Sequence, residues 1–359
     1  MKTDIFLGTF WSGALAVCLM LGSSASANAQ AAQVGNAVAK PSMPSFAPGE
    51  VWKDINGVPI DAHGGGVMFH EGIYYWYGEI KQGKTWTPQC NRSWGGTRVV
   101  MTGVSCYASR DLVHWKNMGN VLPSVSDPNS DLYSGKVLER PKVTYNKSTG
   151  KFVMWMHIES EDYKVARAGV AVADKPAGPF RYLGSVRPDG AMCRDMTLFQ
   201  DDDGKAYLFF ASEENATMHV SLLTDDYLKP SGKFERIFVN HSTEAPAVFK
   251  HHGRYYFVGS GCTAWEPNAA RAAVADSIWG PWKELGNPCQ GKDAEKTYRG
   301  QSTFVLPVAG KEDAYIFMAD RWNKDNLMDS RYLWLPLEFK DDHFEVRWLD
   351  RWSLYMLGK

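Results

Sequence analysis

Short runs of aromatic and aliphatic residues recur along the chain, and each run follows a turn residue. The runs are about five residues long. Their turn residues are Gly72, Gly150, Gly204, Gly253 and Asp313. A second short apolar run precedes each turn, as residues 67–69 (VMF) do before Gly72. Two such runs joined by a turn predict a β-hairpin, so the pattern predicts five hairpins.

A second repeat has the same spacing as the hairpins. Residues 173–180 (ADKPAGPF) resemble residues 275–282 (ADSIWGPW), which lie 102 residues later. Two hairpin periods, from Gly150 to Gly253, span 103 residues. We therefore assign residues 268–275 to a strand, although their composition also suits a helix. Repeats of about 50 residues that are nearly all strand are typical of β-propellers, which have four strands in each blade.

The five repeats thus predict an all-β fold, a five-bladed β-propeller. A pair of β-sandwiches is the alternative, but only radial repetition buries five equivalent hairpins in the same way. The inner strands of a propeller converge on a central funnel. Polar residues just before each repeated hairpin are therefore expected to face a common site.

The chain begins with a segment that reads as an export signal. Lys2 supplies a positive end, an apolar stretch covers residues 14–21, and residues 27–29 (ANA) form a cleavage pattern. We therefore predict a signal peptide over residues 1–29, cleaved near Ala29, and a secreted or periplasmic protein. Residues 30–48 are rich in Ala, Pro, Ser and Gln and predict a flexible linker. The propeller domain is expected over residues 49–359, with the fold beginning near Glu50.

Composition narrows the classes of partner. The 39 basic and 40 acidic side chains nearly balance, which argues against nucleic-acid binding, because that needs a clustered basic excess. A hydrophobic content of 44% excludes a disordered chain. No segment after the export signal is long and apolar enough to span a membrane. A monomer is expected. The feature left to explain is the aromatic content of 17 Phe, 14 Trp and 16 Tyr.

Cysteines and acidic loops give little sign of a metal or cofactor. The spacing of a zinc site is absent, so no metal site is predicted. Disulfides joining Cys90 to Cys106, or Cys262 to Cys289, are both conceivable, and the sequence does not decide between pairing and free thiols. Residues 201–204 (DDDG) suit a hairpin turn better than a cation loop. No cofactor is expected, although a structural calcium ion stays open.

Acidic or amide residues recur at one position relative to the hairpins. Those that precede a hairpin are Glu139, Asp195, Glu244 and Gln301, and Glu79 follows the first hairpin. Any one of them alone is explained well by a solvated turn, but the set follows the repeat. Carboxylates that converge in an apolar pocket repel one another and lose hydration, so some of their pKa values should rise. A pair of carboxyl groups is the minimal equipment for glycoside hydrolysis. Calcium binding is the rival interpretation.

The aromatic residues fit the same interpretation. Flat Trp and Tyr rings suit the C–H faces of sugars, while their polar edges reach hydroxyl groups. Most are expected in the blade cores. Trp265 is the best candidate for a sugar contact because it follows the end of a predicted strand. The expected partner is an oligo- or polysaccharide, and the nearly neutral chain suits a neutral glycan.

A series of motifs runs in order from about residue 50 to residue 356. They are residues 62–66 (AHGGG), 75–79 (YWYGE), 104–107 (VSCY), 139–143 (ERPKV), 194–195 (RD), 201–204 (DDDG), 244–246 (EAP) and 319–322 (ADRW). In this order they resemble glycoside hydrolase family 43, whose members are five-bladed propellers that cleave glycosidic bonds with inversion. The resemblance is greatest to the branch of exo-β-1,3-galactanases.

The resemblance implies roles for individual residues. Glu244 in the Glu-Ala-Pro motif would be the general acid, and Asp195 would orient it and tune its pKa. Other positions match those that line the sugar subsite in the galactanase-like branch, namely Glu139, Glu79, Tyr163 and Asn215. The remaining candidates for substrate contact are Trp265, Thr263 and His63. The segment 82–97 is an insert that could reshape the sugar pocket.

The catalytic base is the point at which the chain departs from most of the family. The usual Asp-Pro before the first hairpin is replaced by residues 63–66 (HGGG). The galactanase-like branch also lacks that Asp, and a Gln matching Gln301 has been proposed there to hold the water. A neutral amide is a weak base, so Gln301 would need an imidic-acid tautomer or a proton relay. Asp61 and Glu139 are the alternative bases. Inversion predicts ~6.5–9.5 Å between acid and base.

Other activities stay open at this stage. Within the family they are an α-L-arabinofuranosidase, a β-D-galactofuranosidase and a β-xylosidase. A propeller that binds carbohydrate without cleaving it would fit the missing Asp. An esterase is disfavoured, because no G-x-S-x-G motif accompanies residues 63–66.

Overall fold

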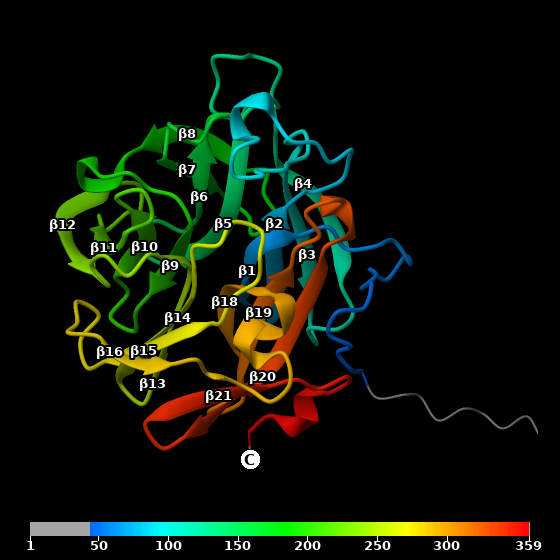
Figure 1. Ribbon diagram of the computed structural model, residues 1–359, viewed down its shortest axis with the longest axis vertical. Coiled ribbons are helices and arrows are strands. Elements are labelled where there is room, and N and C mark those ends of the chain that lie inside the picture. The colour runs from blue at the N-terminus through cyan, green and yellow to red at the C-terminus, as the bar shows by residue number, and fades with distance from the viewer. Residues whose placement is uncertain (1–43, 359) are drawn as a thin grey trace, which may run out of the picture. The chain divides into compact units, whose positions relative to one another are not determined.

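The computed structural model describes residues 44–358, which form five consecutive antiparallel sheets (Figure 1). The first sheet contains β1 (His63–His70), β2 (Ile73–Glu79), β3 (Gly103–Ser109) and β4 (Lys116–Pro123). The second contains β5 (Val137–Asn146), β6 (Lys151–Glu159), β7 (Arg167–Ala173) and β8 (Arg181–Val186). The third contains β9 (Met196–Gln200), β10 (Ala206–Ser212), β11 (Thr217–Leu223) and β12 (Pro230–Ile237).

The fourth and fifth sheets complete the series. The fourth contains β13 (Thr243–His251), β14 (Arg254–Gly261), β15 (Arg271–Ala275) and β16 (Lys283–Gly286). The fifth contains β18 (Gln301–Pro307), β19 (Tyr315–Arg321), β20 (Arg331–Lys340), β21 (His343–Arg347) and the short parallel strand β17 (Cys289–Gln290). The only helices in this part of the chain are 3-10 turns, namely η1 (Gln89–Asn91), η2 (Pro188–Gly190), η3 (Ala294–Arg299), η4 (Leu327–Asp329) and η5 (Leu354–Met356).

One inner strand of each sheet, namely β1, β5, β9, β13 or β18, faces the centre of a closed ring. Contacts join the successive inner strands β1, β5, β9, β13 and β18, and β18 returns to β1. The predicted five-bladed β-propeller is therefore confirmed. Each of the five predicted hairpins joins the inner strand of a blade to its neighbour, and residues 271–275 form the predicted strand.

The hairpin turns explain the repeated glycines. Gly72, Gly150, Gly204 and Gly253 all have φ between 68° and 82°, the left-handed region that L side chains rarely adopt. Asp313 takes the same conformation in the fifth hairpin, with φ 53°. The turn residue thus follows the backbone geometry that each two-strand connection requires.

Most of the aromatic residues lie in the cores between blades. Trp76 of the first blade is 1% exposed and packs against Trp334 of the fifth, with ring centroids 4.7 Å apart. Phe46 stacks on Trp352 at 4.2 Å, and the two backbones exchange hydrogen bonds of 2.7 and 3.1 Å. Buried packing therefore begins at Phe46, earlier than the start expected near Glu50. The predicted signal peptide and the linker up to residue 43 lie outside the described residues.

Two further features answer questions that the sequence left open. All five cysteines in the described part of the chain are free, so neither of the two conceivable disulfides forms. No helix among residues 44–358 is both long enough and apolar enough to cross a membrane.

Candidate active site

The inner strands begin with a β-bulge in four of the five blades. A residue within the first three of each of these strands pairs near the end of the neighbouring strand, as His63–Glu79, Glu139–His157, Glu244–Ser260 and Gln301–Asp320. The register shifts directly after the first three of these pairs, and one residue later, after Ser302, in the fifth blade. Bulges are common beside active sites because they redirect a side chain. In the third blade, Asp195 stands immediately before β9.

Two of these bulges hold non-glycine residues in the left-handed region. Arg140 has φ 54° and Ala245 has φ 55°, each directly after a candidate site residue. Such conformations cost about 1–3 kcal/mol each and persist where the surrounding structure imposes them. The backbone is therefore strained at the two points that aim Glu139 and Glu244.

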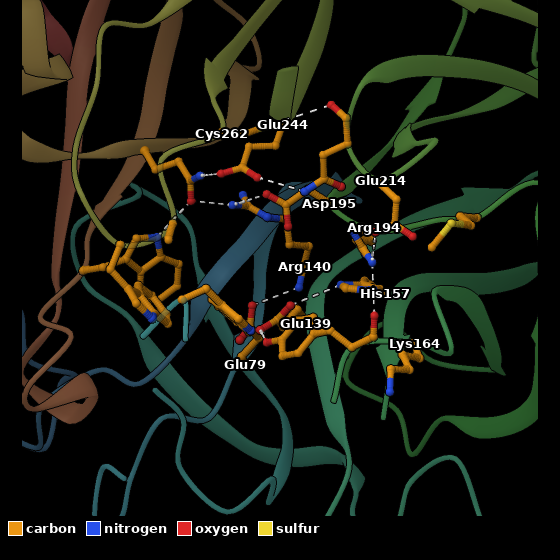
Figure 2. Close-up of a pocket in the computed structure, with 18 of the residues that line it drawn as sticks. Glu79, Glu139, Arg140, His157, Lys164, Arg194, Asp195, Glu214, Glu244 and Cys262 are labelled. Atoms are coloured by element: carbon orange, nitrogen blue, oxygen red, sulfur yellow. Dashed lines mark hydrogen bonds and ion pairs between the residues drawn. The ribbon is translucent and has the colours of Figure 1, made fainter. Parts of the chain in front are cut away.

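A cavity of about 800 Å³ lies where these strand ends meet (Figure 2). Eight of the ten predicted site residues line it, namely Glu79, Glu139, Tyr163, Asp195, Asn215, Glu244, Trp265 and Gln301. His63 does not, because it is buried and stacks on Tyr332 with ring centroids 4.8 Å apart. Thr263 does not either, because its hydroxyl donates to the carbonyl of Glu266 at 2.5 Å. The structure therefore does not bring His63 and Thr263 into the cavity lining.

Glu244 lies on one side of the cavity among neutral hydrogen-bond donors. The amide Nε2 of Gln301 donates to its Oε1 at 3.1 Å, and Nδ2 of Asn215 donates to its Oε2 at 3.3 Å. Burial raises the pKa of Glu244 to about 8, and the charge of Asp195 adds to the rise while Arg140 opposes it. The carboxyl group is therefore protonated at neutral pH, as a general acid must be.

Arg140 connects the groups around the cavity. Its Nη2 lies 2.8 Å from Asp195 Oδ2 and donates to Gln301 Oε1 at 2.6 Å, while Nη1 donates to the carbonyl of Ser302 at 2.9 Å. Its backbone N–H donates to Glu79 Oε1 at 2.9 Å. The side chain is 5% exposed, so this buried cation fixes the positions of the acidic and amide groups around it.

The amide of Gln301 has a partner on every side. Its Nε2 donates to Glu244 and, at 3.1 Å, to Ser260 Oγ, while its Oε1 accepts from Arg140 and, at 3.1 Å, from the indole of Trp322. Two donors on Oε1 disfavour an imidic-acid tautomer protonated there. The 3.1 Å contact with Glu244 is also far shorter than the ~6.5–9.5 Å expected between acid and base.

Glu139 lies in the opposite electrostatic environment. His157 Nδ1 is 3.1 Å from its Oε2, and the hydroxyl of Tyr163 donates to its Oε1 at 2.8 Å. Burial alone would raise the pKa of Glu139, but the hydrogen bond and charge of His157 and the charge of Lys81 lower it to about 2. Figure 2 shows Arg140 between Glu139 and Glu244. Glu139 and Glu244 therefore lie on different sides of the cavity and have pKa shifts of opposite sign.

His157 is a buried residue of the cavity lining whose pKa is raised to about 9. It is 1% exposed, and its Nε2 lies 3.7 Å from Glu159 Oε2, on the side away from Glu139. Burial opposes its charge, but hydrogen bonds to the two glutamates raise its pKa. Glu159 in turn accepts backbone N–H groups from the loop after β6, including those of Val165 and Ala166.

Gly64, one of the residues that stand where most of the family has Asp-Pro, lies against a carboxylate. A Cβ atom at Gly64 would lie 2.2 Å from Glu79 Oε1, so that carboxylate fills the space of any side chain there. Glu79 is itself buried and paired with Lys81 at 2.5 Å. Asp61, one of the alternative bases, is absent from the cavity lining and accepts the backbone N–H groups of Lys81 and Gln82.

The insert over residues 82–97 forms part of the cavity wall. Trp94 lines the cavity and meets Tyr163 edge-on, with ring centroids 5.2 Å apart. Asn91 fastens the insert by donating its Nδ2 to the carbonyl of Glu161 at 2.7 Å. Trp265 lies edge-on to Trp322 at 5.7 Å elsewhere in the lining. The cavity therefore has aromatic walls from three separate loops.

Sequence reasoning missed several residues that build this site. They are Lys81, Trp94, Arg140, His157 and Trp322. A usable signal was present, because the second strand of several hairpins has a polar residue at or near its end, as at Glu79, His157 and Asp320. Pairing those ends with the starts of the inner strands would have identified His157.

One group of side chains in the cavity has the composition of a metal site. Ligand atoms of Glu139, His157 and Asp195 lie within 4.8 Å of one another. However, His157 is an imidazolium, and Arg140 pairs with Asp195. Protein cations thus already neutralise these carboxylates, and the donor set does not suit a metal ion.

The chain was compared with known proteins. The profile of the family described as glycosyl hydrolases family 43 matches residues 67–344. A β-D-galactofuranosidase of Aspergillus niger is 26% identical over 241 residues, covering 64% of this chain and 69% of the relative.

Solved structures of the same family are more similar. The structure of a β-1,3-galactosidase with galactodeoxynojirimycin is 43% identical in sequence and has a TM-score of 0.80. The matched region covers 86% of this chain and 100% of the galactosidase chain. A variant exo-β-1,3-galactanase of Phanerochaete chrysosporium with β-1,3-galactotriose is 34% identical, with a TM-score of 0.77. The matched region covers 86% of this chain and 68% of the galactanase chain.

Proposed function

Because the chain belongs to glycosyl hydrolase family 43, we propose that it releases galactose from the ends of β-1,3-linked galactan chains with inversion at the anomeric carbon. The similar structures that bind a galactose analogue and β-1,3-galactotriose support this substrate. The observation that carries the proposal is the protonated carboxyl of Glu244 in the cavity, because glycoside hydrolysis begins with proton donation to the leaving oxygen.

Glu244 is proposed as the general acid. Its proton passes to the glycosidic oxygen as the bond from that oxygen to the anomeric carbon breaks. Burial of Glu244 raises its pKa and the charge of Asp195 adds to the rise, and Asp195 also accepts the N–H of Ala245 at 3.1 Å. Asp195 therefore both raises the proton affinity of the acid and fixes the backbone that carries it.

Glu139 is proposed as the group that takes the proton of the attacking water. It is a buried carboxylate of the cavity whose pKa is lowered to about 2, and Arg140 lies between it and Glu244. The water oxygen attacks the anomeric carbon while its proton passes to Glu139. When Glu244 turns to the substrate, Gln301 loses an acceptor, and its freed N–H can then hold the water. Gln301 thus orients the water without serving as the base.

An exo mode of action suits the shape of the cavity. The insert that carries Trp94 is fastened to the loop after β6, and Trp265 and Trp322 come from loops of other blades. Walls from several loops enclose a terminal sugar, and their flat apolar rings suit its C–H faces.

The proposal is tested by incubating the protein with β-1,3-galactan and with aryl glycosides of galactopyranose, galactofuranose, arabinofuranose and xylose. Galactose as the main product from galactan is expected, with the α-anomer appearing first in proton NMR because inversion converts the β-linkage. Release of only galactofuranose, arabinose or xylose would reassign the substrate within the family. The β-anomer appearing first would contradict inversion.

A further inference from the structure

A second cavity lies outside the catalytic cavity, at the ends of strands in the fifth blade. Its volume is about 690 Å³. Four of its lining residues are basic, namely Lys292, Arg299, Arg321 and Arg347, and two are acidic, Asp293 and Asp350. We call it the basic cleft. It shares no lining residue with the catalytic cavity.

Three of the four basic side chains in the basic cleft have no acidic partner. Within residues 44–358, neither Lys292, Arg299 nor Arg321 lies in an ion pair. Arg347 is paired with Glu345 at 2.7 Å. Asp350 instead accepts the indole N–H of Trp348 at 2.8 Å. The cleft therefore has an excess of positive charge that the protein does not neutralise by direct contact.

The backbone and side chains hold this charge in place. Arg321 donates to the carbonyl of Tyr298 through Nε and Nη2, at 3.2 and 2.8 Å, and its guanidinium lies 5.2 Å from the ring centroid of Trp348. Thr297, Tyr298 and Arg299 are three successive non-glycine residues with positive φ, between 51° and 66°. Such a run is strained, and here it sets the direction of Arg299.

Arg299 also connects the basic cleft to the catalytic cavity. A small cavity between the two is lined by Arg299 together with Trp265, Gln301 and Trp322. The last three residues also line the catalytic cavity, and Arg299 also lines the basic cleft. Arg299 therefore lies beside residues that line the catalytic cavity.

We propose that the basic cleft is an accessory subsite for an anionic group, a carboxylate or a sulfate, on the glycan whose terminal sugar occupies the catalytic cavity. Guanidinium groups bind such oxyanions with paired, directional hydrogen bonds. An anion there would offset the repulsion between Arg299 and Arg321, which, after burial, is the next cause of the lowered pKa of Arg321. The identity of the glycan rests on the proposed function, whereas binding of an acidic sugar does not.

The test is a calorimetric titration at low salt, with saturating galactose present to fill the catalytic cavity. The probes are galactose 6-sulfate, glucuronic acid, glucose as the neutral sugar, and inorganic sulfate. We expect one site that prefers at least one acidic sugar over glucose, and the acidic sugar that binds more tightly identifies the group. The double variant Lys292→Gln/Arg299→Gln should weaken this binding at least about tenfold. Lys116→Gln, a change of an exposed lysine on β4, should leave it unchanged.

Three outcomes would overturn the proposal: no preference for either acidic sugar, unchanged binding by the double variant, or inorganic sulfate binding as tightly as galactose 6-sulfate. Thermal melting checks that the variants are folded. Activity on neutral β-1,3-galactan is measured in parallel and should be retained by the double variant. Acidic sugars that bind a protein inactive on galactan would overturn the proposed substrate alone.

Discussion

Glu244 and Glu139 occupy the same cavity but are driven in opposite directions. Glu244 meets amide donors and the negative charge of Asp195, and its pKa rises to about 8. Glu139 meets a buried imidazolium and a tyrosine hydroxyl, and its pKa falls. Both side chains lie near the start of an inner strand, just before a bulge. Similar backbone positions therefore yield one carboxyl group with a raised pKa and one with a lowered pKa, because different partners surround them.

Burial alone does not decide whether the pKa of a carboxyl group rises or falls. Burial acts in the same sense on both residues, and it raises each pKa. The charge of the nearest partner reverses the outcome at Glu139. Removing each carboxyl group tests its role in turnover, and changing its partner tests the cause of its pKa shift.

Removing the acid should have the largest effect. Glu244→Gln keeps the size and hydrogen-bonding capacity of the side chain but has no proton to donate. We expect kcat on β-1,3-galactan to fall by about 10³-fold or more, which is within the contribution of general acid catalysis. Glu338→Gln on β20, an exposed glutamate, serves as the matched control. Wild-type turnover by Glu244→Gln would contradict the assignment of Glu244 as the general acid.

Removing the proposed base should cause the next largest loss of kcat. Glu139→Gln is expected to lower kcat by about 10²–10³-fold, because the water would lose its proton acceptor. Gln301→Ala should lower it less, by about tenfold, since Gln301 only orients that water. The two variants are measured side by side in single-turnover experiments. A larger loss in Gln301→Ala than in Glu139→Gln would return the role of base to Gln301.

The pH dependence of kcat/KM tests the raised pKa of Glu244. Glu244 must be protonated, so kcat/KM of the wild type should fall above about pH 8. Asp195→Asn removes the charge that helps to raise the pKa of Glu244, so the alkaline limb of the profile should move to lower pH. The profile is recorded with an aryl galactoside, and thermal melting checks the fold, because Arg140 would lose its partner. An alkaline limb that does not move would contradict the role of Asp195.

The smallest effect is expected from the partner of Glu139. His157→Gln retains a hydrogen-bond donor but removes the positive charge, so the pKa of Glu139 should rise. Glu139 must be ionised, and the acid limb of the profile should therefore move to higher pH. The loss of kcat at pH 7 should stay below about tenfold. An unchanged acid limb, with reduced stability, would mean that His157 only supports the fold.

Much of the fold was predictable because it repeats. The hairpins at Gly72 and Gly253 follow one local pattern, and five copies of that pattern permit few architectures. The start of buried packing at Phe46 was missed, because its contact with Trp352 joins residues about 300 positions apart. A pattern of neighbouring residues carries no information on such a pair.

The site was predictable only in part, for a similar reason. Glu244 and Asp195 follow the repeat, so their convergence could be inferred from the sequence. The role of Arg140 could not be inferred, because its partners come from the third and fifth blades. The hydrogen bonds of Gln301 depend on side-chain orientations across blades, and they alter its expected role.

The glycine at position 64 also limits how this active site could be re-engineered. Gly64→Asp, meant to supply the carboxylate that most of the family has before the first hairpin, would place Cβ 2.2 Å from Glu79 Oε1 at a φ of 61°. Shortening Glu79 to make room would leave Lys81 without its carboxylate at 2.5 Å. Introducing a carboxylate at position 64 of this enzyme therefore requires Glu79 and Lys81 to change with it.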